Sequence, residues 1–592
     1  MPGRVRRLRP LAALTCWSIA PLALASVQLQ VRGVDEPLAQ AITASVELSQ
    51  YTQREASAAQ VQRMAERAPA QAEKALEPFG YYAAHATAQV EPAGKDWKVT
   101  LTVVPGAPVM VTTVEVQLDP AALALPPIRR AHRAITRLAG QRLDAAQYDA
   151  ARDAMSAALT ANGYLDARLV TRRVAVYSAA HRAEIHLAWQ VGPRFRYGRV
   201  EFDHSPFHPG FLDRYVPFKP GDYFNQDQLL QLQQALNGAD YFAVANVVPN
   251  INPQVPGTVD IAVELKPARR TVYTGGPFIG TDTGYGFRAR MERRYVNRRG
   301  DKWKNELVAA QRLKTLSTTY TIPLPGDHQR SWNIGANYRD ANTATSQSRT
   351  FELVGNETRR WRGWTRTLGV HVLSGTFTVG KRGNEPDTTP GIERGTSTLT
   401  FFEASLTRKQ ADDFAFVREG WSLALAARST AGNALSSASF SDVTADAKWI
   451  HAFGAKRRNR LIVRSSAGHT WTDDFAALPP QLRFFAGGDR SVRGYSYQSI
   501  GPRNHADRVM GGVNLLVGSA EVEHYFTRNW GIASFVDIGN AFDAVDFRPK
   551  IGTGLGVRWR SPVGMIRLDV GTPVHDATRH GMVLHLVIGP DL

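Results

Sequence analysis

Ser491-Val492-Arg493-Gly494-Tyr495 is the stretch that decides the fold of this 592-residue chain. It lies near the end of the chain, in a region that otherwise reads as alternating short strands, and glycines flank it on both sides. An arginine beside a glycine in such a segment is unusual for a surface loop. We therefore predict a loop that folds back into the lumen of a β-barrel and places the Arg493 cation there.

The region around this loop has the pattern of a transmembrane barrel. From Thr271 to Leu592, apolar residues alternate with polar residues, glycines and arginines, most clearly in residues 332–339, 551–560 and 566–570. A soluble β-sandwich also alternates, but lipid outside and water inside demand apolar residues outward and polar ones inward. Because only a closed barrel satisfies all backbone groups of strands in hydrocarbon, we predict an antiparallel barrel over residues 269–592. Its length suits about 16 strands of ~9–11 residues.

Residues 1–25 have the features of a removable signal peptide. Four arginines precede a short apolar core from Leu11 to Leu22, and Ala23-Leu24-Ala25 is a small-x-small cleavage site. The only cysteine, Cys16, lies in this segment, so we expect no disulfide or thiolate site in the mature chain. After Ala25 no stretch of ~18 or more apolar residues follows, so we predict no transmembrane helix. An exported chain of this kind is either a soluble periplasmic protein or an outer-membrane barrel.

The chain is strongly basic. Its formal net charge is +18, and removal of the four signal-peptide arginines leaves 18 − 4 = +14. This excess indicates anionic neighbours, and lipid head groups fit an envelope protein. A basic composition shared by all proteins of the organism is the alternative. Nucleic acid is not expected as a partner, because no Lys/Arg-rich run with interleaved aromatic residues occurs.

Residues 26 to about 268 contain a threefold repeat with a period of ~75–85 residues, which indicates stacked modules. Each repeat closes with a strand that has one buried face. The apolar residues of these strands are Val99, Leu101 and Val103, then Ile185, Leu187 and Trp189, then Val259, Ile261 and Val263. In the second repeat, Asp144 is the expected N-cap of a helix that Gly163 ends. We predict a strand, two helices and two strands (βααββ) in each module, and a purely spacing role is the plainer alternative.

Nothing in the sequence points to catalysis. Gly375 to Lys381 fits a phosphate-binding loop, but Arg382 replaces the Ser or Thr that would hold magnesium, and no βα unit surrounds it. We find no G-x-S-x-G, no H-E-x-x-H and no histidines with metal-ligand spacing. We therefore predict that the chain is not an enzyme and holds no cofactor or metal.

Val492-Arg493-Gly494-Tyr495 resembles the V-R-G-[YF] motif of the BamA/TamA superfamily, whose barrels carry this motif on a loop tucked into the lumen. The βααββ modules resemble POTRA domains, the periplasmic modules of outer-membrane assembly factors. The resemblance implies α+β POTRA modules followed by an outer-membrane barrel, with POTRA domains at 26–106, 107–192 and 193–268. It also implies that Asp537 and, less directly, Glu521 are the acidic partners of Arg493, with Glu523 as a competitor.

The chemistry of such a cluster is coherent by itself. A planar guanidinium can hold two carboxylate oxygens, and Gly494 lets the loop approach the barrel wall closely. Removing one partner of a buried ion pair costs ~3–5 kcal/mol. The plainer interpretation is that the pair only stabilises the barrel.

The two ends of the barrel sequence suggest a weak seam. The first strand is expected near Tyr273 to Tyr285 and is rich in glycines, among them Gly275 and Gly276, which weaken strand pairing. The last strand, within residues 581–589, presents Leu584, Leu586 and Ile588 on one face. We predict that this seam opens and that its edges pair with an incoming strand.

Three modules and the ending Gly589-Pro590-Asp591-Leu592 most resemble the TamA branch of the superfamily. The resemblance implies a TamB-like inner-membrane-anchored partner for the POTRA domains, unfolded outer-membrane and autotransporter-type clients, and contact with outer-membrane lipid. It places the barrel in the bacterial outer membrane and the modules in the periplasm. The alternative is a passive polypeptide secretion channel of the two-partner type.

Overall fold

The computed structural model describes residues 26–588, apart from 53, 55, 94–95, 384, 415, 544–546, 563 and 575–580. The predicted signal peptide and the ending Gly589-Pro590-Asp591-Leu592 lie outside the described residues. The chain divides into two compact units, one with the first two modules and one with the barrel, and the third module contributes residues to both. No helix among the described residues is long and apolar enough to cross a membrane.

The first module has the predicted βααββ order. A capping box between Ser57 and Gln60 begins its long helix, whose buried face packs on the three-stranded sheet β1-β3-β2. The elements are β1 (Val27–Arg32), α1 (Glu36–Ser45), the 3-10 helix η1 (Glu47–Tyr51), α2 (Ala58–Leu76), η2 (Glu77–Phe79), β2 (His85–Ala93) and β3 (Asp96–Val104).

The second module repeats this plan around its own core and the sheet β4-β6-β5. As predicted, Asp144 caps a helix by accepting a hydrogen bond from the backbone N of Gln147, and Gly163 follows the helix with φ +98°. The elements are β4 (Met110–Gln117), α3 (Pro120–Leu123), α4 (Pro126–Thr136), α5 (Ala145–Ala161), β5 (Arg168–Tyr177), η3 (Ser178–Ala180) and β6 (Arg182–Gln190).

The third module departs from the predicted two helices. A four-residue 3-10 helix stands where the first α-helix was expected, because four prolines and two glycines between residues 204 and 221 prevent a longer helix. Its sheet order is β7-β9-β8. The elements are β7 (Arg196–Asp203), η4 (Leu212–Tyr215), α6 (Gln226–Gly238), β8 (Phe242–Ile251) and β9 (Thr258–Pro267).

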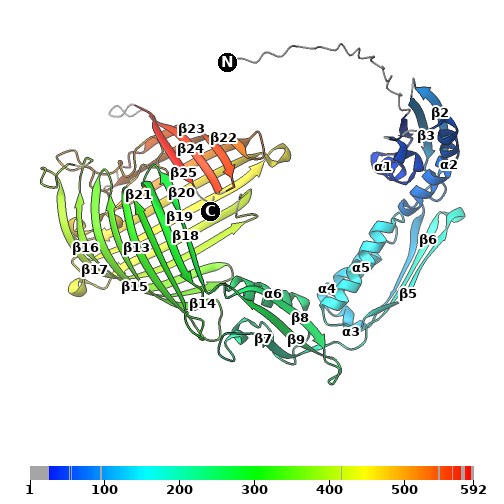
Figure 1. Cartoon of the computed structure of the whole chain (residues 1–592), viewed down its shortest axis with the longest axis horizontal. Helices are drawn as coiled ribbons and strands as arrows, with labels where there is room; N and C mark the ends of the chain where they lie inside the picture. The colour runs from blue at the N-terminus through cyan, green and yellow to red at the C-terminus, as the bar shows by residue number, and fades with distance from the viewer. Residues whose placement is uncertain are drawn as a thin grey trace, which may run out of the picture. The chain divides into compact units, whose positions relative to one another are not determined.

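The C-terminal half forms the predicted barrel of sixteen strands, each antiparallel to the next along the chain (Figure 1). Predicted outward residues such as Trp332, Ile334, Leu568 and Val570 are exposed on its outer face. The strands are β10 (Thr271–Gly280), β11 (Gly284–Arg293), β12 (Lys302–Ala310), β13 (Leu313–Pro323), β14 (Arg330–Asn342), β15 (Ser346–Trp361), β16 (Trp364–Val379), β17 (Glu393–Ala411), β18 (Glu419–Thr430), β19 (Phe440–Phe453), β20 (Asn459–Thr472), β21 (Asn514–Tyr525), β22 (Trp530–Phe542), β23 (Lys550–Ser561), β24 (Gly564–Val574) and β25 (Val583–Ile588).

The first barrel strand is shorter than predicted. The segment from Tyr273 to Tyr285 is not one strand, because β10 ends at Gly280 and β11 begins at Gly284, whose φ is +79°. A turn at residues 281–283 therefore divides the glycine-rich segment, since the positive φ at residue 284 favours glycine. Strands β10 and β11 have 10 residues each, whereas β17 has 19. The barrel wall is therefore shorter at β10 and β11, beside the seam, than at β17.

Candidate functional site

The loop between β20 and β21 carries Arg493 and is packed into the barrel. Val492 and Tyr495 are buried with Ala486, Ile500 and Val517 in a small apolar cluster. The Arg493 residue is only 3% exposed. The motif thus anchors the loop with apolar groups on either side of one cation.

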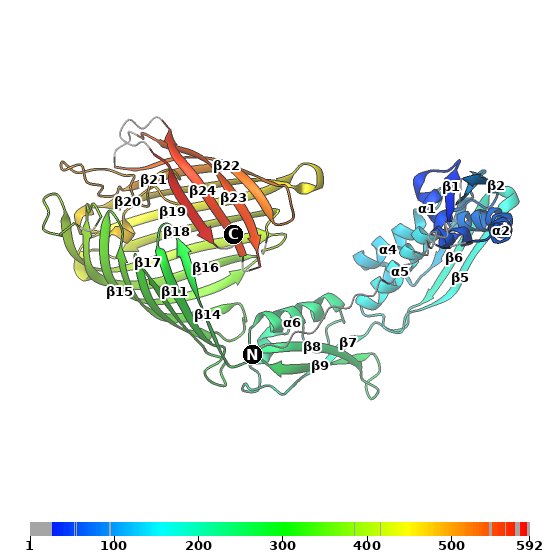
Figure 2. The ribbon, with the colours of Figure 1, turned by 45° about the horizontal axis from the view of Figure 1, so that its top comes forward.

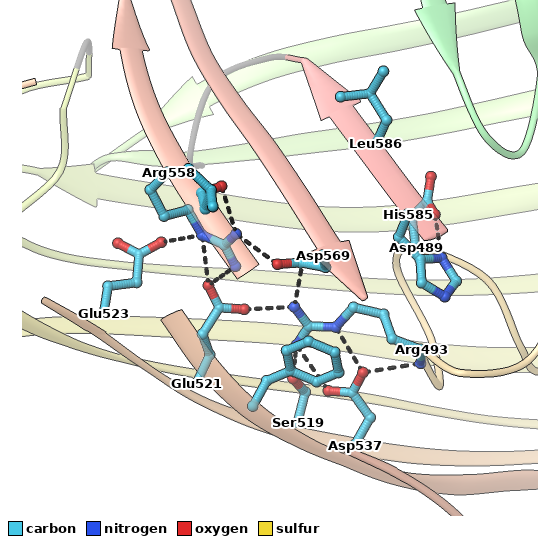
Figure 3. A network of polar contacts seen from close by, with 12 residues as sticks. Asp489, Arg493, Ser519, Glu521, Glu523, Asp537, Arg558, Asp569, His585 and Leu586 are labelled. Atoms are coloured by element: carbon cyan, nitrogen blue, oxygen red, sulfur yellow. Dashed lines mark hydrogen bonds and ion pairs between the residues drawn. The ribbon is translucent and has the colours of Figure 1, made fainter. Parts of the chain in front are cut away.

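Arg493 meets Asp537 of β22 in a two-pronged ion pair (Figure 3). Its Nε donates to Asp537 Oδ2 at 2.8 Å, its Nη2 donates to Oδ1 at 3.0 Å, and its backbone N also donates to Oδ2 at 2.9 Å. The guanidinium carbon lies 3.5 Å from the centroid of the Phe535 ring, on the same strand. Two carboxylate oxygens and one ring face therefore fix the plane of the guanidinium.

The remaining Nη1 of Arg493 bridges two further strands. It donates to Glu521 Oε2 of β21 at 2.7 Å and to Asp569 Oδ2 of β24 at 3.0 Å. A second cation, Arg558 of β23, contacts the other oxygens of both acids, at 2.6 Å from Glu521 Oε1 and 2.6 Å from Asp569 Oδ1. Figure 2 shows β22, β23 and β24 side by side in the wall that carries most of these groups.

The cluster extends to two more arginines. Arg460 of β20 pairs with Glu523, which also accepts from Arg558 Nε at 2.8 Å. Arg464 lies 3.7 Å from Asp537 and donates to Ser519 Oγ at 3.0 Å. The four arginines Arg460, Arg464, Arg493 and Arg558 thus face the four carboxylates Glu521, Glu523, Asp537 and Asp569. Equal numbers of opposite charges offset the cost of burying each one.

The loop cation stays charged in this environment. Burial lowers the pKa of Arg493, but the hydrogen bond to Asp537 and the charges of Glu521, Asp537 and Asp569 outweigh burial and hold the pKa above its ordinary value. The cation that anchors the loop is therefore permanently charged.

Glycine allows the loop to touch the wall. Gly494 has φ +92°, and a Cβ on it would lie 2.8 Å from the backbone carbon of Thr572. On the wall itself, a Cβ on Gly552 would lie 1.8 Å from the carbonyl oxygen of Arg493. Neither position accepts a side chain without displacement of the loop.

The predicted seam residues lie on the two end strands of the sheet. Gly275 and Gly276 pair with β11, and Leu584 and Ile588 of β25 are exposed on the outer face. Leu586 lies between them and is half-buried. Among the described residues, no strand ladder joins β10 to β25.

The structure therefore brings Arg493 together with both acids named from the sequence, and Glu523 contacts other arginines instead. Sequence reasoning missed Asp569, Arg558, Arg460, Arg464 and His585 as parts of the site. Alternation does place Arg558, Asp569 and His585 on the inward face, but it does not say which inward residues meet. The described residues hold no group of three or more His, Cys, Asp or Glu side chains suited to a metal.

Comparison with known proteins gives three family matches. Residues 296–589 match the Omp85 superfamily domain, residues 28–105 match POTRA domain TamA domain 1, and residues 195–268 match a POTRA model described as surface antigen variable number repeat. The chain is 32% identical over 122 residues to the outer membrane protein assembly factor BamA of Nitratidesulfovibrio vulgaris. That alignment covers 19% of this chain and only 15% of the relative's length.

A solved structure shares the fold. The crystal structure of BamA from Haemophilus ducreyi lacking POTRA domains 1–3 superposes with a TM-score of 0.64 at 15% identity, over 81% of this chain and 98% of the other. CdiB from Acinetobacter baumannii gives a TM-score of 0.46 at 14% identity, over 81% and 89% of the two chains.

Proposed function

We propose that this chain, whose residues 296–589 match the Omp85 superfamily domain and follow segments that match POTRA models, is an outer-membrane assembly factor that inserts β-barrel or autotransporter-type clients. Clients enter the membrane through the seam between β10 and β25. The proposed domains are POTRA modules at 26–106, 107–192 and 193–268 and a barrel at 269–592. This role involves no catalysis, in keeping with a family of transport and assembly factors.

The observation that carries the proposal is the seam itself, where the described parts of β10 and β25 form no ladder. An exposed strand edge presents unpaired N–H and C=O groups, and these groups template an incoming strand. The low wall beside the seam supports this function, because strands of 10 residues span less hydrocarbon than the longer strands opposite. A client strand therefore pairs first and meets a thinned bilayer next.

The Arg493 cluster has a distinct part in this proposal. It ties the loop to β21, β22 and β24, all on one side of the seam. A fixed loop holds the wall beside the seam in place while the seam opens, so that clients leave sideways along a defined strand edge.

The periplasmic modules receive the partner. The match of residues 28–105 to a TamA POTRA model supports the TamA branch, and we propose a TamB-like inner-membrane-anchored protein as the partner of these modules. The barrel then lies in the bacterial outer membrane, in contact with its lipid, and the modules lie in the periplasm.

A disulfide across the seam tests the proposal. A Cβ on Gly280 would lie 3.8 Å from the carbonyl oxygen of Leu586, so the two strands adjoin there. Ile279, next to Gly280, is exposed on the outer face, as are the alternate residues on either side of Leu586 in β25. Ile279→Cys with Leu586→Cys therefore places both thiols on the same face of the seam. The only natural cysteine lies in the predicted signal peptide, which leaves a clean background. We expect the oxidised variant to lose at least about tenfold in client insertion and to recover with reductant, while each single variant inserts normally. Full insertion with the seam sealed contradicts the proposal.

The passive channel makes the opposite prediction for Arg493→Ala. A threading channel gains conductance markedly when its loop is freed. An insertase loses client insertion at nearly constant conductance. Single-channel recording of the two proteins in planar bilayers separates these outcomes.

A further inference from the structure

Three side chains meet at the seam, beside the Arg493 cluster. Thr281 follows β10, and His585 lies on β25. Asp489 lies on the loop between β20 and β21, the same loop that carries Arg493. Thr281 Oγ1 donates to Asp489 at 2.8 Å from Oδ1 and 3.0 Å from Oδ2, and His585 Nδ1 lies 2.6 Å from Asp489 Oδ1. One carboxylate therefore contacts both sides of the seam, and Figure 3 shows its contact with His585.

The hydrogen bonds around His585 define one arrangement of its ring. The backbone N of Gly494 donates to His585 Nε2 at 3.0 Å, so Nε2 is the acceptor. Nδ1 then carries the proton and donates to Asp489. The His585 residue is only 2% exposed, so both contacts are shielded from water. The ring thus joins the last strand to the loop at two points.

The same cluster supplies a direct link between the two end strands. The backbone N of Leu586 in β25 donates to Thr281 Oγ1 at 3.1 Å. The Thr281 hydroxyl therefore accepts from one edge of the seam while it donates to the loop carboxylate. No ladder between the described parts of β10 and β25 supplements this bond.

We propose that Thr281, Asp489 and His585 form a latch that holds the seam closed and makes its opening depend on the loop. This inference rests on the proposed function, since it names what controls the seam. Loss of the Asp489 carboxylate leaves the hydroxyl of Thr281 and the Nδ1–H of His585 without their acceptor. Displacement of the loop therefore frees both strands from the loop and leaves the Thr281 hydroxyl, which accepts from the backbone N of Leu586, without the carboxylate that orients it. The Arg493 cluster keeps the rest of the loop on the wall.

The latch is tested by a distance across the seam. Tyr285 of β11 and Leu568 of β24 are exposed on the outer face, one strand back from the seam on either side. Spin labels on cysteines at these two positions report the seam width by double electron–electron resonance in lipid nanodiscs. Two variants test the latch. Thr281→Val keeps the shape of the side chain and removes the hydroxyl. Asp489→Ala removes the carboxylate that accepts from both Thr281 and His585.

Two further variants serve as controls. Thr283→Val alters the same turn, but the Thr283 hydroxyl donates to the neighbouring carbonyl of Gly284, at 3.4 Å, and not to the loop. Thr281→Ser retains the hydroxyl. We expect Thr281→Val and Asp489→Ala to lengthen the mean distance by roughly 5 Å or more, the spacing of one strand. Thr283→Val and Thr281→Ser should match the parent protein.

An unchanged distance in both Thr281→Val and Asp489→Ala overturns the latch. The measurement involves no client, so its result is independent of insertion activity. If the seam widens as expected but the disulfide-sealed protein still inserts clients, the latch stands and the proposed function fails.

Discussion

The wall from β21 to β24 and the seam from β25 to β10 hold the same loop in different ways. In the wall, β21 and β22 pair continuously from Asn514 to Tyr525. On the inward face of this wall, four arginines face four carboxylates. At the seam, one carboxylate and one hydroxyl link two strands whose described residues share no ladder. The wall holds the loop by a buried network of ion pairs, in which charged hydrogen bonds are strong. At the seam a single carboxylate accepts from the loop's two partners, and the direct bond between the two edges, from the backbone N of Leu586 to Thr281 Oγ1, is neutral and contributes about 1 kcal/mol. The loop is thus fixed on one side and releasable on the other.

Removing the central cation should have the largest effect on this contrast. Arg493→Ala leaves Asp537 and Glu521 buried without their shared partner, and we expect the barrel to lose about 3–5 kcal/mol of unfolding free energy. Urea unfolding in detergent micelles measures the loss. Arg493→Lys should recover only part of it, because an ammonium cannot hold both oxygens of Asp537.

The control for this variant is an exposed ion pair. Arg359 lies 3.2 Å from Asp327, and both side chains are substantially exposed, so Arg359→Ala should cost at most about 1 kcal/mol. Equal losses in Arg493→Ala and Arg359→Ala would show that the lumen cluster is not the main anchor of the loop.

The contact between the loop and the wall should be the next most sensitive feature. Gly494→Ala combines a positive φ of +92° with a Cβ 2.8 Å from the backbone of Thr572, and we expect a loss of about 2–4 kcal/mol from strain and displacement. Gly432→Ala is the matched control, because Gly432 has φ +90° and open space around its Cβ position. It isolates the cost of placing a side chain at a positive φ, about 1–3 kcal/mol. The same urea titration compares the two, and a loss in Gly494→Ala no greater than in Gly432→Ala would remove steric contact as the cause.

Much of the wall could be predicted from the sequence, because strand alternation is a local property. The period of two is enough to place Arg558, Asp569 and His585 on the inward face. It does not say which of them meet, since this depends on strand stagger and on the path of a long loop. Glu521 and Glu523 show the limit: both point inward, yet the stagger brings Glu521 to Arg493 and Glu523 to Arg460.

Sequence patterns also mispredicted strands and helices where a turn or several prolines interrupt the segment. The glycines between Tyr273 and Tyr285 suggested one weak strand, but Gly284 adopts a positive φ and begins a second strand. In the third module, the helical pattern of the other two modules does not extend through a segment rich in proline. The latch was not predictable either, because its three side chains come from segments that are over 90 and 200 residues apart.

A stronger first strand should produce the smallest change in unfolding free energy. Unlike the other variants, it should raise that free energy. A Cβ on Gly276 of β10 meets nothing within 4 Å, so Gly276→Val fits and favours the strand. We expect a gain of about 0.5–1 kcal/mol in unfolding free energy and slower client insertion by a few-fold, because a better strand pairs more firmly beside the seam.

Gly355→Val on β15 also enters open space but lies in the ladder between β14 and β16, so it should stabilise the barrel without slowing insertion. Equal slowing by both variants would mean that overall rigidity, and not the seam, limits insertion. If only Gly276→Val slows insertion, the rate-limiting step of insertion is the opening of the seam between β10 and β25, where the strands are joined most weakly.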